Sequence, residues 1–321
     1  MHWVGGCCIM LTSATLALKP FSWYKMIISA SRRTDIPAFY SEWFINRIRA
    51  GYCEVVNPFN SSQIAHVSLQ PVDVDIIVFW TRHAAPLMPR LEELDARGYA
   101  YYFLYSILGY PRSIEPYSPT LEIAIRTFKN LSNRIGAPRV IWRYDPILIS
   151  EHTSLTYHQR QFQRISRSLE NFTQRVIISF VDRYTKTRHR FLRLAAQGYD
   201  LTEPSAIPQD DILDFLTTLG KEADEHGMEV TFCAEEGLPV AQNVRQGKCI
   251  DDEFIGREFG IKINTIKDPY QRKACRCVIS KDIGVYDSCL FGCRYCYACV
   301  GSEKAIQMYT RHNPGSPRLI G

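Results

Sequence analysis

Three cysteines near the end of the chain have a spacing that suits an iron–sulfur cluster. In the segment CLFGCRYCYAC, residues 289–299, the thiols of Cys289, Cys293 and Cys296 stand at positions i, i+4 and i+7. Three thiolates can each ligate one iron of a [4Fe-4S] cluster and leave the fourth iron open for another ligand. The spacing therefore predicts a cluster that is held by these three side chains.

Two other residues of the segment bear on how the thiols are used. Gly292 permits the tight turn that would point the thiols inward, because glycine has no Cβ. Cys299 could supply a fourth thiolate, and four closed ligands suit tetrahedral zinc. A structural zinc site is therefore the alternative interpretation, and in the cluster interpretation Cys299 has no assigned role.

The pattern CxxxCxYC, residues 289–296, resembles the signature of the radical S-adenosylmethionine enzymes, with Tyr295 in the aromatic position. The resemblance implies that the cluster binds S-adenosylmethionine through its free iron and that Tyr295 packs near the adenine. It implies reduction by an electron donor such as flavodoxin or ferredoxin. The 5'-deoxyadenosyl radical then formed would take a hydrogen atom from a small-molecule substrate.

The position of the motif departs from that family, in which it normally follows the first strand of a barrel. Only about twenty residues follow Cys299 here. We therefore expect either a permuted order, in which residues 282–288 form the strand that delivers the cysteine loop, or a tail that folds over the mouth of the barrel. No glycine-rich segment matches the family's contact to the amino group of S-adenosylmethionine.

Four other cysteines form a second set after residue 230: Cys233, Cys249, Cys275 and Cys277. The chain has eleven cysteines and no evident signal peptide, and a reducing cytosol keeps thiols out of disulfides. Our hypothesis is that the second set binds an auxiliary iron–sulfur cluster, with zinc or separate free thiols as alternatives. Cys53, on an expected strand, is interpreted as a small buried hydrophobe.

An α/β fold must position these residues, because short β-branched and aromatic runs alternate with segments of helical periodicity. Strands are expected at residues 26–31, 53–57, 74–81, 100–106, 139–144, 175–181 and 229–233, and helices near 118–135, 155–172 and 212–227. Residues 248–251 and 283–286 compete for an eighth strand. The count favours a TIM-type (β/α) barrel, permuted or incomplete, over an open doubly wound sheet. Ser118 is the expected cap of the first helix.

Charged side chains follow nearly every expected strand. In a barrel the loops after the strands converge on one mouth, where active sites lie. Arginines that converge there would suit an anionic substrate, because a guanidinium binds a carboxylate or phosphate through two hydrogen bonds. Individual charged residues of this set, such as Asp35 and Asp145, could instead be helix caps or turn residues. The catalytic candidates are Arg32, Arg33, Asp35, Arg143, Asp145 and Glu235.

Composition gives only broad limits on partners and location. A formal net charge of +5, a hydrophobic content of 46% and the lack of a long apolar run indicate a soluble, cytoplasmic chain with no membrane segment. The densest basic run, residues 183–193, could contact nucleic acid, but a solvated helix face is the commoner explanation. Nucleic acid therefore stays open as a partner without being indicated.

The expected organisation is a barrel domain over residues 26–248 and a cysteine-rich iron–sulfur segment over residues 249–321, packed at the barrel mouth. Residues 1–25 are interpreted as an N-terminal extension or a mis-called start, because MIISASRRTD, beginning at Met26, has the pattern of a strand that enters a polar turn.

From Met26 onward the chain also resembles domain-of-unknown-function family 1848, an uncharacterised bacterial group. The matching stretches are SRRTDIPAFY, FWTR, RYDPI, FCAE, KCIDD, CRCVISKDIGVYDSC and GCRYCYA. This resemblance indicates which residues belong together, and it implies no substrate.

Overall fold

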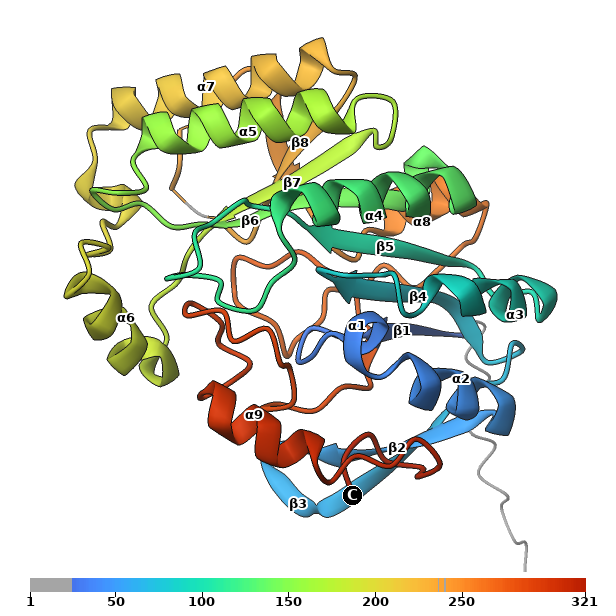
Figure 1. Ribbon diagram of the computed structural model, residues 1–321. Coiled ribbons are helices and arrows are strands. Elements are labelled where there is room, and N and C mark those ends of the chain that lie inside the picture. The colour runs from blue at the N-terminus through green and yellow to red at the C-terminus, as the bar shows by residue number, and fades with distance from the viewer. Residues whose placement is uncertain (1–24, 236, 240) are drawn as a thin grey trace, which may run out of the picture.

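The computed structural model describes residues 25–321 apart from positions 236 and 240, so the expected N-terminal extension lies almost wholly outside the described residues. Within these residues the centre is a sheet of eight parallel strands in the order β10-β1-β4-β5-β6-β7-β8-β9 (Figure 1). The strands are β1 Met26–Ala30, β4 Val74–Thr81, β5 Tyr101–Ser106, β6 Val140–Ile147, β7 Arg175–Phe180, β8 Glu229–Cys233, β9 Val244–Gly247 and β10 Lys281–Asp282.

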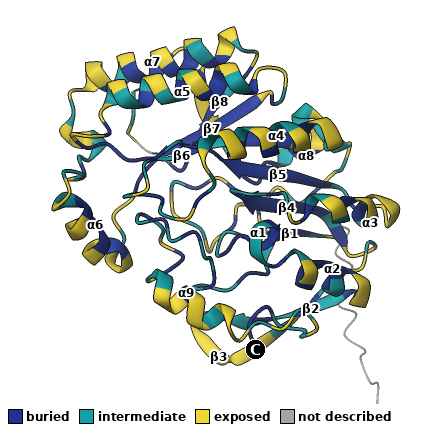
Figure 2. Cartoon of the chain, viewed as in Figure 1, coloured by how far each residue is buried: buried dark blue, intermediate teal, exposed yellow. Residues whose placement is uncertain are grey.

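Helices connect most of these strands, as parallel pairing requires. They are α1 Ile36–Phe39, α2 Ser41–Ala50, α3 Leu91–Ala96, α4 Leu121–Ile135, α5 Leu155–Leu169, α6 Arg188–Ala195, α7 Gln209–Glu225, α8 Asp252–Phe259 and α9 Ser302–Tyr309. In Figure 2 the central strands are buried, whereas α4, α5 and α7 each show an exposed outer face. The amphipathic periodicity of these helices therefore matches their position on the sheet.

Two hydrophobic cores lie on opposite faces of the sheet, because successive side chains of a strand point to opposite sides. On β4, Ile77 and Phe79 belong to one core, and Val78 and Trp80 belong to the other. The first core contains the buried faces of α2, α4, α5 and α7. The second contains α8 together with the cysteines of the second set. The cysteines of the second set therefore pack on the face of the sheet opposite to α2, α4, α5 and α7.

The strand expectations agree with the sheet except at residues 53–57. This segment is β2, Tyr52–Asn57, which pairs antiparallel with β3, Asn60–Ser68, in a separate two-stranded sheet. The two candidates for an eighth strand each lie directly after an edge strand, β9 or β10. These two edges are not paired with each other among the described residues, so the sheet is not a closed barrel there. The chain between them instead forms α8 and packs on the sheet face.

The first long helix begins two residues later than Ser118 suggested. Thr120 is its N-cap, and its hydroxyl accepts a hydrogen bond from the Ile123 N–H at 3.4 Å. Ser118 is buried instead, with its hydroxyl 3.9 Å from the thiol of Cys293. A residue that sequence patterns assign to a helix end therefore contacts the cysteine loop.

The C-terminal part of the chain returns to the N-terminal strands and helices. β10 pairs in parallel with β1, with Ser29 opposite Asp282. Near the end of the chain, Trp43 on α2 donates a hydrogen bond to the Ser316 carbonyl at 3.0 Å, and Asn46 donates to that of Pro314 at 3.0 Å. In Figure 1 the red C-terminal segment accordingly lies beside α2 and β2.

Candidate functional site

A cavity of about 1160 Å³ lies at the carboxyl ends of the parallel strands. Strands β4 to β8 each contribute lining side chains from near their carboxyl ends, namely Trp80, Thr81, Ser106, Asp145, Pro146, Ser179 and Cys233. Further walls come from residues 55–65 and from the segment of residues 264–298. The cavity therefore brings together the two parts of the chain that carry most of the candidate residues.

The three cysteines of the motif all line this cavity, on the loop between β10 and α9. Gly292 has a φ of +66° in that loop, the left-handed conformation that favours glycine. A hydrogen bond from the Cys299 thiol lowers the pKa of Cys296 to about 6. Burial raises the pKa of Cys293 to about 12.

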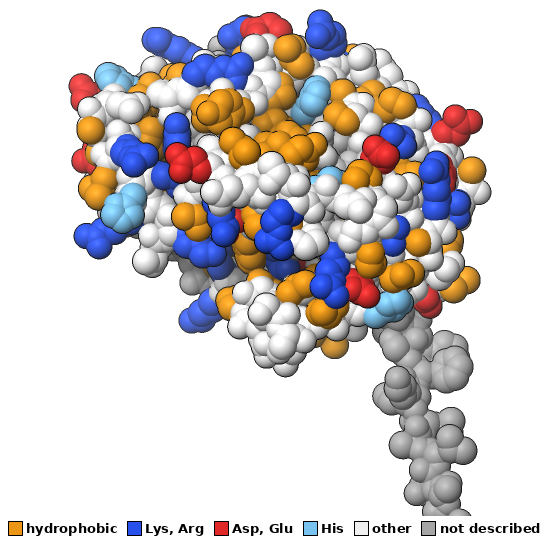
Figure 3. Space-filling model, turned by 60° about the horizontal axis from the view of Figure 1, so that its bottom comes forward, with side chains coloured by type: hydrophobic (Ala, Val, Ile, Leu, Met, Phe, Trp, Pro, Cys, Tyr) orange, Lys and Arg blue, Asp and Glu red, His pale blue; other side chains and the backbone are white. Residues whose placement is uncertain are grey.

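Helix α6 fixes the backbone of the same loop. Arg190 on α6 is buried and donates hydrogen bonds to the carbonyls of Cys293 at 3.3 Å and Cys296 at 2.5 Å. Arg190 belongs to the basic run of residues 183–193, so one of its arginines binds backbone inside the protein. Lys and Arg side chains on the face shown in Figure 3 are dispersed among hydrophobic and acidic ones.

Tyr295 is buried in a polar network beside the motif. Its hydroxyl donates a hydrogen bond to Glu115 and accepts one from Arg82, and Arg82 pairs with Glu115 at 2.8 Å. The ring lines the cavity, where the resemblance would place an adenine. Sequence reasoning missed Glu115, because it lies in a proline-rich loop that has no periodic pattern.

The four cysteines of the second set converge on the same cavity. Cys249 donates a hydrogen bond to the sulfur of Cys233 at 3.1 Å, and the thiols of Cys233, Cys249 and Cys275 are near enough to Cys277 to lower its pKa. As the side chains stand, no group of three or more His, Cys, Asp or Glu residues in the described ranges has the arrangement of metal ligands. The four thiols therefore share one cavity and one core, and those of Cys233 and Cys249 are in direct contact.

Two of the candidate arginines stack on one tryptophan in the cavity. The guanidinium carbons of Arg32 and Arg143 lie 4.9 and 4.8 Å from the centre of the Trp80 ring. Arg143 also pairs with Asp145, and Arg32 donates to the Ser280 hydroxyl at 3.1 Å. Sequence reasoning did not select Trp80, although it lies in FWTR, one of the stretches that carried the family resemblance.

The remaining candidates have different environments. Asp35 caps α1 and accepts hydrogen bonds from the Thr81 hydroxyl at 2.8 Å and the Arg82 N–H at 2.6 Å, and burial raises its pKa to about 7. Arg33 lines the cavity with its guanidinium over the ring of Tyr286.

Glu235 is the one catalytic candidate outside the lining of the cavity. Its carboxylate accepts a hydrogen bond from the Phe180 N–H at 2.7 Å, and burial raises its pKa to about 7. Glu235 therefore fastens the end of β8 to that of β7. The expected small hydrophobe, Cys53, is fully buried on β2.

The fold and the cavity define an α/β protein with a parallel sheet and a cysteine-lined cavity at the carboxyl ends of its strands. The chain belongs to the family described as domain of unknown function DUF1848, whose model matches residues 27–298. No curated protein matches the chain. No helix in the described part of the chain has the length and hydropathy needed to cross a membrane.

Several solved structures are weakly similar. They include the D-hydantoinase from a Bacillus sp. AR9, with a TM-score of 0.28 and 9% identity over 75% of this chain and 46% of that one. The pneumococcal virulence factor StrH has a TM-score of 0.26 and 9% identity over 70% of this chain and 58% of that one. The chain thus spans about half the length of these proteins, and likeness at this level carries no argument.

Proposed function

We propose that this protein is an enzyme of the radical S-adenosylmethionine type whose [4Fe-4S] cluster is held by Cys289, Cys293 and Cys296. The observation that carries the proposal is that all three thiols line one large cavity together with several arginines. The donor set fits the group, because three soft thiolates from one short loop suit an iron–sulfur cluster. Arg190 holds the carbonyls of this loop and so fixes the direction of its thiols.

The bound cluster and S-adenosylmethionine would supply a radical that abstracts hydrogen, and the protein must bind and orient the reactants. Tyr295 offers an aromatic wall whose hydroxyl is held by Arg82 and Glu115, so the ring cannot rotate freely. Three arginines of the lining could bind an anionic small molecule through their guanidinium groups. They are Arg33 and the two that stack on Trp80, Arg32 and Arg143. Cys293 and Tyr295 are buried, which would limit the access of bulk water to a reactant held between them.

We also infer that the sheet is an incomplete (β/α) barrel, because six of its strands follow one another in chain order and all are parallel. A reductant such as flavodoxin or ferredoxin would deliver the electron, and a reducing cytoplasm would keep the free cysteines reduced. The position of the motif at the end of this barrel agrees with a permuted order.

The test is anaerobic purification and reconstitution of the full chain, followed by iron analysis, electron paramagnetic resonance with and without S-adenosylmethionine, and an assay for 5'-deoxyadenosine after reduction. The wild-type protein and Cys53→Ala, a matched buried cysteine outside the cavity, should both form 5'-deoxyadenosine. Cys293→Ala should form none. A wild-type protein that binds no iron, or product from Cys293→Ala at the wild-type rate, would contradict the proposal.

A structural zinc site is the second candidate, supported by the hydrogen bond between Cys299 and Cys296. In that case Cys299 would be the fourth ligand of a closed tetrahedral site. Cys299→Ala separates the two candidates, because it should abolish zinc retention at this loop but leave a three-cysteine cluster in place.

A further inference from the structure

We propose that Cys233, Cys249, Cys275 and Cys277 bind one divalent metal ion as a tetrahedral four-thiolate centre. This inference does not depend on the radical chemistry proposed above, because none of the four residues belongs to the motif. Of the alternatives that the sequence left open for this set, it selects a single metal ion over an auxiliary cluster, because the sulfur atoms of Cys233 and Cys249 are too close together to serve a four-iron cluster.

The spacing of the sulfur atoms is the first argument. Zinc–sulfur bonds of about 2.3 Å in a tetrahedron put neighbouring sulfur atoms about 3.8 Å apart. The Cys233 and Cys249 sulfur atoms are 3.1 Å apart, and the Cys277 sulfur lies 3.4 Å from the N–H of Ile250, the residue after Cys249. A single ion therefore requires the closest pair to separate by less than about 1 Å. A four-iron cluster would need far more space between its ligands.

The second argument is that the backbone already holds the ligand segments together. Cys233 ends β8, and Cys249 follows β9, the next strand of the sheet. The Tyr102 hydroxyl donates to the Cys249 carbonyl at 2.8 Å, and the Ile250 N–H donates to the Cys277 sulfur at 3.4 Å. An amide donor of this kind stabilises a thiolate.

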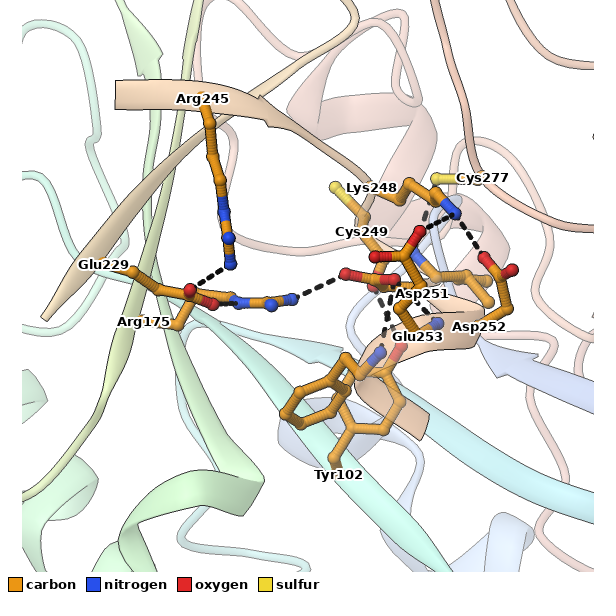
Figure 4. A network of polar contacts seen from close by, with 12 residues as sticks. Tyr102, Arg175, Glu229, Arg245, Lys248, Cys249, Asp251, Asp252, Glu253 and Cys277 are labelled. Atoms are coloured by element: carbon orange, nitrogen blue, oxygen red, sulfur yellow. Dashed lines mark hydrogen bonds and ion pairs between the residues drawn. The ribbon is translucent and has the colours of Figure 1, made fainter. Parts of the chain in front are cut away.

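An ion-pair network fixes the segment that carries Cys249 (Figure 4). Asp251 caps α8 and pairs with the buried Arg175 at 2.8 Å, and Arg175 pairs in turn with Glu229 on β8. The loop is therefore tied to the same strand that delivers Cys233. A site with little freedom in its ligands loses little entropy when it binds a metal.

The third argument is charge. A divalent ion with four thiolates carries a net charge of −2, which is costly to bury without compensation. Arg32 is close enough to Cys277, and Arg143 to Cys249, for their charges to act on these sulfur atoms. Arg32 Nη2 and Arg143 Nε are buried and lack hydrogen-bond partners among the described residues. Both guanidinium groups can therefore offset the negative charge of the metal centre. Arg143 does so only in part, because it also forms an ion pair with Asp145.

The experiment uses the full chain with Cys289, Cys293 and Cys296 all changed to Ala, which removes the proposed cluster but keeps the second set. After anaerobic removal of bound metal, this parent protein is titrated with Co²⁺. We expect one Co²⁺ per chain with the strong visible absorption of tetrahedral cobalt thiolate. X-ray absorption at the cobalt edge should count four sulfur ligands.

Two further variants of this parent protein keep the test decisive. Adding Cys277→Ser should weaken Co²⁺ binding at least 100-fold, whereas adding Cys53→Ser should leave it unchanged. Circular dichroism verifies that both variants remain folded. If Cys277→Ser unfolds the protein, Cys275→Ser replaces it, and the same loss of Co²⁺ binding is expected. No stoichiometric Co²⁺ binding, or two or fewer sulfur ligands, would overturn the proposal.

Discussion

Single buried side chains around the cavity interact mainly with residues that are remote in sequence. Tyr295 contacts Glu115, 180 positions earlier, and Trp80 lies under both Arg32 and Arg143. The cysteines could be selected from the sequence because their spacing is local, and they all line the cavity, but their role as metal ligands stays a prediction. Glu115 and Trp80 could not be selected in this way, because their roles depend on long-range packing that leaves no periodic pattern in the sequence.

The ion pair of Arg82 and Glu115 gives a prediction at this scale. Glu115→Gln leaves the buried guanidinium without a carboxylate, so it should lower the free energy of unfolding by about 3 kcal/mol. Glu122→Gln makes the same change in the exposed pair with Arg164 and should cost less than about 1 kcal/mol. Urea unfolding measures both variants. Equal effects would show that burial of the first pair has no energetic importance.

His158 predicts a dependence of stability on pH. Its Nδ1 lies 2.8 Å from the Tyr144 hydroxyl and its Nε2 lies 2.9 Å from the Leu148 carbonyl, and burial lowers its pKa to about 4. The unfolded chain takes up a proton below about pH 6.5, whereas the folded chain does not until about pH 4. The stability that the neutral histidine contributes is therefore lost as the pH falls through this range, by up to roughly 3 kcal/mol.

Replacing His158 by Gln should remove this part of the pH dependence. The measurement is urea unfolding at pH 7 and pH 5, with His189→Gln, an exposed histidine, as the control. The difference between the two pH values should shrink only in His158→Gln. An unchanged difference would mean that His158 binds its proton equally in both states.

At the scale of elements, strands and helices could be predicted well because each has its own hydrophobic period. The expected strand at residues 53–57 exists, but its pairing with β3 places it outside the main sheet. The pairing partner of a strand could not be predicted, because a run of buried residues has the same hydrophobic pattern whichever sheet the strand joins. Helix α6 shows the same limit, since its basic residues look like a solvated surface although one of them is buried.

If the cysteine loop binds the proposed cluster, helix α6 should control how firmly that cluster is retained. Arg190→Ala removes the donors to the carbonyls of Cys293 and Cys296, so a chelator should extract iron several-fold faster than from the wild type. Arg193→Ala changes an exposed arginine on the same helix and should have no effect. Iron release followed by absorbance distinguishes the variants, and equal rates would contradict a role for Arg190.

At the scale of the whole molecule, the C-terminal segment belongs to the same core as the first strands. Leu319 is almost fully buried in the core that also contains Ile28. We expect Leu319→Ala to lower the free energy of unfolding by about 2–4 kcal/mol and to shift the entire transition. Leu192→Ala, with a side chain that is 59% exposed, should cost less than about 1 kcal/mol. Coincident fluorescence and circular dichroism curves are expected, and an earlier loss of the tail alone would contradict this view.

The pairing of β10 with β1 also sets the order of events during synthesis on the ribosome. Strands β1 to β7 are made before the first of the seven proposed metal ligands, and the cysteine loop of residues 289–299 follows only after β10. Until then the outer edge of β1 has no neighbour in the sheet. If the cysteines hold metal as proposed, insertion at this cavity must therefore wait until the segment of residues 289–296 has been made, and the metal must reach a polypeptide whose main sheet has already been synthesised.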